Sequence, residues 1–332
     1  RYLWGDTALY DEAVARFGAE VVAGTARIFI TDKLAERDAR HKRMGDSRYV
    51  VEPNLKEGKG GLRDLHTLFW IGKYMHRVST VAELVDKGLL TKQELRQFQK
   101  AENFFWAVRS HLHSIANRPE ERLTFDVQRE IAARMRYVDR PGRSAVEKFM
   151  QHYFLTAKQV GDLTGLFLAN LEESEGPKKR RFFSLAGFRR APRNLGGFVL
   201  DAGRIALPRD NFFAEDPIRL IEMFALADEH GVEIHPQAMR VANRDAKLID
   251  ARVRTNPRAN ELLLGVLTSR RDPATVLRWM NDASVFGRFM PDFGRVVAQM
   301  QFDMYHHYTV DEHSIRAIDL LAKIEKGEMG ED

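Results

Sequence analysis

The sequence has 332 residues, of which 44% are hydrophobic and 30% charged, and its formal net charge is +5. This length suits about two domains, and the composition is that of a folded globular protein and not of a disordered chain. So small an excess of positive charge does not indicate a surface that binds nucleic acid. No stretch of the sequence approaches the length of a membrane span, about 18 consecutive apolar residues. We therefore expect neither a nucleic-acid nor a membrane partner.

The chain contains no cysteine. Disulfides and thiolate metal sites are excluded, and a reducing, cytoplasmic location is expected. The sequence begins at Arg1 without a methionine and stops at Asp332 soon after a helical pattern. We expect it to be an internal piece of a longer protein.

Helical periodicity dominates the chain. Apolar side chains recur at helical spacing and predict helices over residues 7–17, 25–44, 92–116 and 145–171. Helix starts of the Ser/Thr-x-x-Glu type, in which side chain and backbone cap each other, are expected at Thr80, Thr91, Ser144 and Thr309.

One segment departs from the helical pattern. Residues 172–208 contain a Gly-Pro pair and two basic runs, at 178–181 and 189–193, and then two short apolar runs about an Asp-Ala-Gly turn at 201–203. We predict a basic linker followed by a small β-hairpin.

A glycine-rich stretch, EPNLKEGKGGLRDLH at residues 52–66, follows a short β-prone run at 49–51 and opens a helical pattern. Its basic residues and adjacent glycines are the candidate nucleotide-binding set: Lys56, Lys59, Gly60, Gly61 and Arg63. Glycine lets the backbone approach a polyphosphate, and arginine can bind it with two hydrogen bonds. The spacing is not that of a Walker A loop, and a surface turn with solvated charges is the alternative.

Asp64 follows this loop directly, at the start of the predicted helix. It could contribute a catalytic carboxylate to a Mg²⁺ site, as the clustered acids of nucleotidyl transfer do. A helix N-terminal acid favoured by the helix dipole is the simpler alternative.

A second cluster, at residues 305–313, contains His306, His307 and His313 together with two acids. A helix capped at Thr309 would place His313 one turn inside it, where a neutral imidazole can ligate a metal. The alternative is a histidine packed on an apolar helix face, because no H-x-x-x-H or His-Asp pair follows before the chain ends.

The order of these landmarks resembles the bifunctional PII-protein uridylyltransferase/uridylyl-removing enzyme family. The resemblance is carried by EPNLK (52–56) with GGLRDLHTL (60–68), by LTFDVQ (123–128), by AVEKFMQHY (145–153) and by MYHHYTVDEH (304–313). The Gly-Gly-Leu-Arg-Asp piece is also similar to one in glutamine synthetase adenylyltransferase.

The resemblance implies transfer of UMP from UTP to a tyrosine of the PII signalling protein with release of diphosphate, and removal of that UMP when glutamine is plentiful. It implies Mg²⁺ for the transferase, a divalent metal (Mg²⁺ or Mn²⁺) in an HD hydrolase domain, and glutamine as an effector through domains that this chain lacks. His313 carries over as a hydrolase metal ligand. The loop residues carry over only by position, and their contact with UTP is our hypothesis.

The expected fold is mainly α, with helical-bundle lobes that follow the tail of a polymerase-β-like nucleotidyltransferase domain. The expected divisions are the end of that domain (1–64), a helical domain (65–171), the basic linker and hairpin (172–208), a second helical lobe (209–300) and the start of an HD domain (301–332). By itself this chain should be inactive in both reactions. The other possibilities are an enzyme like the adenylyltransferase, a non-catalytic helical interaction module, and an RNA-directed nucleotidyltransferase.

Overall fold

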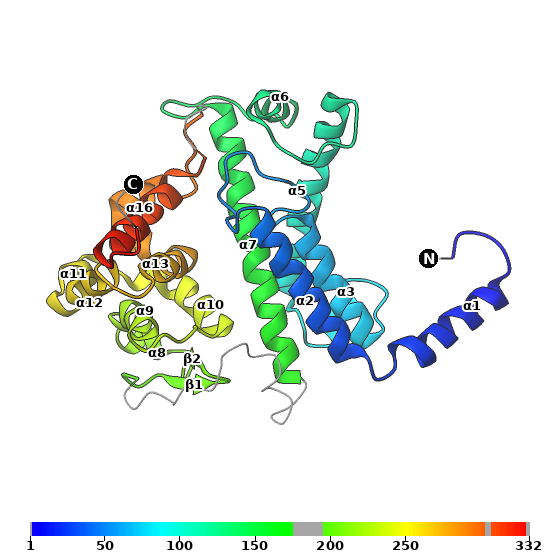
Figure 1. Cartoon of the computed structure of the whole chain (residues 1–332), viewed down its shortest axis with the longest axis horizontal. Coiled ribbons are helices and arrows are strands. Elements are labelled where there is room, and N and C mark those ends of the chain that lie inside the picture. The colour runs from blue at the N-terminus through cyan, green and yellow to red at the C-terminus, as the bar shows by residue number, and fades with distance from the viewer. Residues whose placement is uncertain (1, 175–194, 303–306, 330–332) are drawn as a thin grey trace.

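The computed structural model describes residues 2–174, 195–302 and 307–329. Within these ranges the chain is mainly helical, and the strands form one small antiparallel hairpin. The long helix α7 (Ala145–Ser174), drawn in green at the centre of Figure 1, belongs to the first of two helical lobes and faces the second. The expectation of a mainly α fold with a small hairpin is confirmed.

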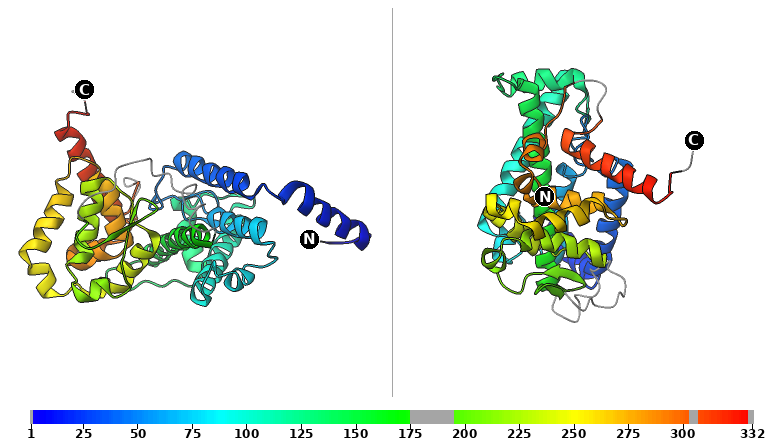
Figure 2. Two further views of the ribbon diagram at one scale, coloured as in Figure 1. Left: turned by 90° about the horizontal axis from the view of Figure 1, so that it is seen from below. Right: turned by 90° about the vertical axis from the view of Figure 1, so that its left-hand side faces the viewer.

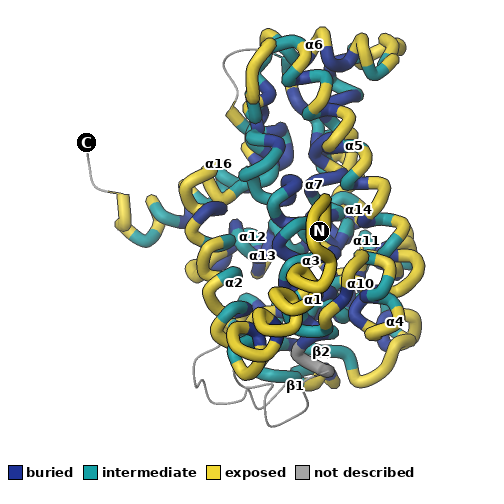
Figure 3. Tube along the Cα trace, turned by 90° about the vertical axis from the view of Figure 1, so that its right-hand side faces the viewer, coloured by how far each residue is buried: buried dark blue, intermediate teal, exposed yellow. Residues whose placement is uncertain are grey.

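The first lobe consists of α7 and the helices that precede it in the sequence. These are α1 (Thr7–Arg16), the π-helix η1 (Phe17–Val22), α2 (Ala26–Arg43), α3 (Leu62–His76), α4 (Glu83–Asp86), α5 (Lys92–Ala116) and α6 (Phe125–Arg134). Helix α1 extends away from the rest of the lobe in both Figure 1 and Figure 2, and none of its residues is buried (Figure 3).

The second lobe follows the hairpin, whose strands β1 (Val199–Asp201) and β2 (Arg204–Ala206) pair Leu200 with Ile205. Its helices are α8 (Phe212–Glu215), α9 (Arg219–His230), α10 (Pro236–Asp245), the 3₁₀-helix η3 (Ala246–Leu248), α11 (Ala251–Thr255), α12 (Pro257–Leu267), α13 (Pro273–Asp282), α14 (Val285–Phe289), α15 (Pro291–Val296) and α16 (Val310–Glu325).

Helix α7 supplies much of the core of the first lobe. Phe149, Tyr153 and Phe154 recur at helical spacing and are fully buried. The Tyr153 ring meets Phe105 of α5 edge to face, with 5.6 Å between the ring centroids. The helix starts at the expected cap, because the Ser144 amide donates to Glu147 at 2.8 Å and the Glu147 amide donates to the Ser144 hydroxyl at 3.3 Å.

The other expected helix starts differ among themselves. Thr91 and Glu94 form the complete capping box that begins α5, as predicted. Thr80 donates to the Glu83 carboxylate, but α4 begins only at Glu83 itself.

The capping box expected at Thr309 is wrong. The Thr309 hydroxyl is buried and has no hydrogen-bond partner among the described residues. The Glu312 carboxylate instead accepts from Arg278 of α13 and from Arg316. These charge-assisted hydrogen bonds are stronger than the neutral amide contact that a capping box would offer.

At two of the predicted domain boundaries, residues on both sides share one hydrophobic core. Ile30 and Leu55 share one core with Leu65, so a boundary at residue 64 cuts through the first lobe. Ile315, expected in a separate HD domain, lies in the core of the second lobe. The two basic runs of the predicted linker lie outside the described residues.

The lobes are joined by a short antiparallel contact between segments far apart in the sequence. Val50 is bridged to Tyr308. The Val51 amide donates to the His307 carbonyl at 3.0 Å, and the Thr309 amide donates to the Tyr49 carbonyl at 3.1 Å. We call this contact the joint (residues 49–51 and 307–309). It ties the run that enters the glycine-rich loop to the segment that opens α16.

No helix in the described part of the chain is both long enough and apolar enough to span a membrane.

Candidate functional site

The glycine-rich loop is a compact turn anchored at both ends. Leu55 and Leu62 are buried in the core of the first lobe, and the Leu62 amide donates to the Leu55 carbonyl at 3.1 Å. Inside the turn, the Asn54 side-chain oxygen accepts from the amides of Lys56 and Glu57 at 3.1 and 2.7 Å. The loop therefore has a fixed shape set by its own backbone.

The glycines of this loop are required by close backbone packing. Gly60 has a φ of +79°, and a Cβ there would lie 2.3 Å from the Ala157 carbonyl oxygen of α7. A Cβ at Gly61 would lie 2.7 Å from the Leu55 carbonyl oxygen. Contact between the loop and its own lobe thus explains both residues, without any ligand.

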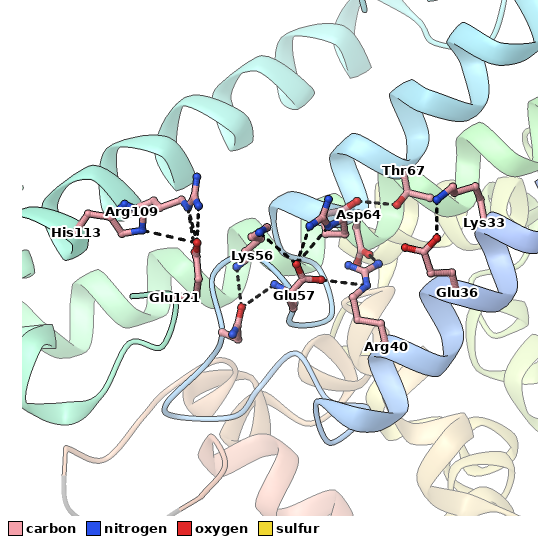
Figure 4. A network of polar contacts seen from close by, with 12 residues as sticks. Lys33, Glu36, Arg40, Lys56, Glu57, Asp64, Thr67, Arg109, His113 and Glu121 are labelled. Atoms are coloured by element: carbon pink, nitrogen blue, oxygen red, sulfur yellow. Dashed lines mark hydrogen bonds and ion pairs between the residues drawn. The ribbon is translucent and has the colours of Figure 1, made fainter. Parts of the chain in front are cut away.

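Asp64 lies inside the protein at the start of α3 and is 3% exposed. Its oxygens accept from Arg40 at 2.6 Å, from His41 at 3.0 Å and from the Gly60 amide at 2.7 Å. His41 is the donor in its contact, because an ionised carboxylate can only accept. This carboxylate joins α2, the loop and α3, and its surroundings do not fit a Mg²⁺ ligand (Figure 4).

The pKa of Asp64 reflects this environment. Burial alone would raise it, but the hydrogen bond from His41, the charges of His41 and Arg40 and the Gly60 amide together hold it below the ordinary value of an aspartate. The group is therefore ionised in the folded protein at neutral pH.

The basic residues of the loop are paired with nearby acids. Lys56 and Arg63 lie 3.7 and 2.9 Å from Glu57, which Figure 4 shows beside Lys56 and Arg40. Lys59 lies 2.8 Å from Asp46. The predicted set is thus brought together in space, but it does not converge on one ligand.

The outer face of the loop is nonetheless electropositive. His66, on the next turn of α3, is half-buried, and burial together with the charges of Arg63, Arg109 and Lys56 lowers its pKa. Arg63 also lies over the Trp70 ring, 5.5 Å from its centroid.

A pocket of about 360 Å³ opens on the other side of the loop. Its wall contains four basic residues, one acid and a tyrosine: Arg43, Arg48, Lys59, Arg122, Glu52 and Tyr153. Of the predicted nucleotide-binding residues, Lys59 lines this pocket. The other three cations are Arg43 at the end of α2, Arg48 just before the β-prone run and Arg122 in the segment before α6, and nothing local in the sequence marks them as neighbours.

The predicted metal ligand His313 lies on the first turn of α16 and is exposed. Its acidic neighbours face the protein: Asp311 accepts from Asn281 at 2.9 Å, and Glu312 accepts from Arg278. Among the described residues, no three side chains of the metal-binding types come together. His306 of the predicted cluster lies outside the described residues.

Comparison with known proteins gives two matches to models of one family, one within each lobe. The model described as GlnD PII-uridylyltransferase matches residues 28–168, and the model described as uridylyltransferase GlnD third domain matches residues 198–289. The chain belongs to the GlnD uridylyltransferase family. The first match crosses residue 64 without a break, in agreement with the single core of the first lobe.

Curated members of the GlnD family are similar to this chain over almost its whole length. Proteins named bifunctional uridylyltransferase/uridylyl-removing enzyme are 65% identical in Novosphingobium aromaticivorans and 60% identical in Erythrobacter litoralis, each over 332 residues. The protein of that name in Rhodospirillum rubrum is 54% identical over 327 residues, which is 98% of this chain. The chain spans about a third of the length of these relatives (36%, 36% and 35%). No solved structure matches it.

Proposed function

We propose that the full-length protein transfers UMP from UTP to a tyrosine of the PII protein, releasing diphosphate, and also removes that UMP by hydrolysis. In this proposal the present chain is the region between the two catalytic centres, and it is inactive alone. Glutamine acts as the effector through domains outside this chain, and the protein works in the cytoplasm. The names of the similar proteins support both activities.

One structural observation supports the connecting role. The joint pairs residues 49–51, which enter the glycine-rich loop, with residues 307–309, which open α16. The run that leads into the transferase-like landmark is therefore hydrogen-bonded to the hydrolase-like one. We expect a shift of one segment to move the other.

For the glycine-rich loop we propose a positioning role. Asp64 fixes it to α2, Gly60 fits it against α7, and the charges of Lys56 and Arg63 are taken up by Glu57. Lys59 is the loop cation placed to contact a ligand directly, because it lines the pocket. Mg²⁺ for the transferase would then be bound by acids outside the described residues.

For His313 we propose a place among the ligands of the hydrolase metal, Mg²⁺ or Mn²⁺, with the remaining donors supplied from beyond the described residues. This proposal rests on the resemblance and on the position of His313 on the exposed side of the first turn of α16. Asp311 and Glu312 are excluded as partners, since both are buried against α13.

The test is the replacement His313→Ala in the full-length protein. Uridylyl removal should be lost and bound metal per chain should fall, whereas UMP transfer to the PII protein should continue. His111→Ala, on α5, is the matched control and should change neither reaction. Unchanged removal and metal content would reject the role of His313, and a protein without transferase activity would reject the proposed function.

A further inference from the structure

The pocket beside the glycine-rich loop has an unusual balance of hydrogen-bonding groups. Its acceptors are already used within the protein. The Glu52 carboxylate accepts from Arg122 at 3.2 Å and from the Phe125 amide at 2.9 Å, and the Asn54 oxygen accepts from two loop amides. The Ser47 hydroxyl oxygen accepts from the Tyr49 amide at 3.2 Å.

Lys59 and Arg122 of the pocket are paired with Asp46 and Glu52, but two other donors of the pocket have no such partner. Tyr153 is 1% exposed and lines the pocket, and its hydroxyl has no hydrogen-bond partner among the described residues. Burial and the charge of Asp64 raise the pKa of this phenol, so it keeps its proton and can donate. The hydroxyl is not among the fully enclosed polar atoms of the described residues, so it is open to the pocket that Tyr153 lines.

Arginine adds further donors. Arg48 lines the pocket, but its Nη1 is enclosed and lies 3.5 Å from the Asp282 carboxylate. Arg43, at the end of α2, forms no ion pair with any described residue. Arg43 and the Tyr153 hydroxyl therefore favour a ligand that accepts hydrogen bonds and carries negative charge.

We propose that this pocket binds the di- or triphosphate group of a small ligand. Its volume of about 360 Å³ exceeds what a single phosphate needs and lies at the lower end of small-molecule sites. Phosphate oxygens accept from arginine in a planar, two-point geometry and from a phenol equally well. The inference stands on the pocket and is independent of the proposed enzymatic activity.

Occupation of this pocket has a structural consequence. Val50 lines the pocket and is also bridged to Tyr308 in the joint. A ligand that holds the pocket wall in place should therefore also stabilise the pairing of the two lobes, since it binds only the folded arrangement.

The test uses this chain in calorimetric titrations with diphosphate, UTP and UMP at low ionic strength. Saturable one-to-one binding of diphosphate is expected, and it should weaken as salt is added. Equal affinity for diphosphate and UTP indicates recognition of the polyphosphate alone, whereas tighter binding of UTP indicates added contacts to the nucleoside. UMP should bind much more weakly than either.

Two variants locate the site. Tyr153→Phe removes only the hydroxyl that lacks a partner, so the protein should fold normally and bind diphosphate about tenfold more weakly. Arg43→Ala should have an effect of similar size. The matched controls are Tyr74→Phe, whose hydroxyl is bound to Thr25, and Arg288→Ala on the exposed face of α14. Both controls should bind like the unaltered chain.

Two results would overturn the proposal. One is the absence of saturable diphosphate or UTP binding by a chain that melts cooperatively. The other is binding that neither Tyr153→Phe nor Arg43→Ala weakens, which would place the ligand elsewhere. Hydrogen exchange gives an independent readout, because diphosphate should slow exchange of the Val51 and Thr309 amides.

Discussion

At the scale of single residues, Asp64 is a buried carboxylate that depends on the donors around it. A buried carboxylate is tolerated only when donors replace the water that it has lost, and here Arg40, His41 and the Gly60 amide do so. Two of these donors come from α2 and the third from the loop, whereas Asp64 itself lies on α3. The residue therefore holds the loop in place through charge, and its removal leaves Arg40 buried beside a more distant acid, Glu57, at 3.8 Å.

Asp64→Asn should destabilise the chain by about 3 kcal/mol, because it breaks a buried ion pair while keeping the side chain's shape. Urea unfolding at neutral pH measures this difference. Asp86→Asn, on the exposed surface of α4, is the control and should change little. A loss below about 1 kcal/mol would contradict a positioning role for Asp64.

The same residue makes a pH-dependent contribution with a definite sign. Its pKa is lowered in the folded protein, so its contribution is complete above the unfolded value of about 3.9 and is lost as the pH falls through the folded value. The stability difference between the unaltered chain and Asp64→Asn should therefore be constant near neutrality and shrink below about pH 4. A difference that grew on acidification would show the opposite shift.

At the scale of elements, the contact between the glycine-rich loop and α7 positions the loop. Gly60 approaches the backbone of α7 more closely than any residue with a side chain allows. Because the contact is with a carbonyl oxygen in the middle of a helix, neither partner can yield easily.

Gly60→Ala should cost about 3 kcal/mol, from a positive φ and a backbone clash together. Gly88→Ala is the matched control: its φ is +70°, but no atom lies within 4 Å of the added Cβ. This control should lower the free energy of unfolding by about 1 kcal/mol, from the left-handed backbone conformation alone. Thermal or urea unfolding separates the two, and equal losses would mean that the contact with Ala157 contributes nothing.

At the scale of the whole molecule, two cores meet at the joint and along α7. Tyr49 donates to Asp282 of α13 at 3.3 Å, and Arg48 lies 3.5 Å from the same carboxylate. On the other side, Arg240 of α10 donates to Glu94 of α5 at 3.1 Å. Polar contacts thus join the lobes beside apolar ones, because Ala298 and Met300, which follow α15, lie in the core of the first lobe.

Asp282→Ala should loosen the joint without unfolding either lobe. The Thr309 amide, which donates to the Tyr49 carbonyl, should exchange its hydrogen about tenfold faster. Amides in the middle of α5 should be unaffected. Asp292→Ala, which alters a highly exposed side chain on α15, should leave the joint unchanged. Exchange that rises equally throughout the chain would indicate general destabilisation and not a local joint.

The helices could be predicted because their causes are local. The start of α5 at Lys92 and its end at Ala116 follow from a capping box and an apolar repeat within one stretch of chain. The hairpin at 199–206 follows in the same way from its Asp-Ala-Gly turn. The family resemblance also needed only the order of short motifs.

Other features depended on residues far apart in the sequence. Whether Glu312 caps its helix or binds Arg278 is decided by the position of α13. The surroundings of Asp64 depend on α2, and the pocket brings Arg43 and Arg122 together with Tyr153.

The sequence by itself therefore determined the helices, the hairpin and the family, because each rests on interactions between close neighbours. Only the tertiary structure decided which charges are neutralised and which donors remain for a ligand. The glycine-rich loop illustrates the contribution of the sequence and that of the tertiary structure. Its glycines and lysines are evident in the sequence, but their pairing with Ala157, Glu57 and Asp46 exists only once the lobe is packed.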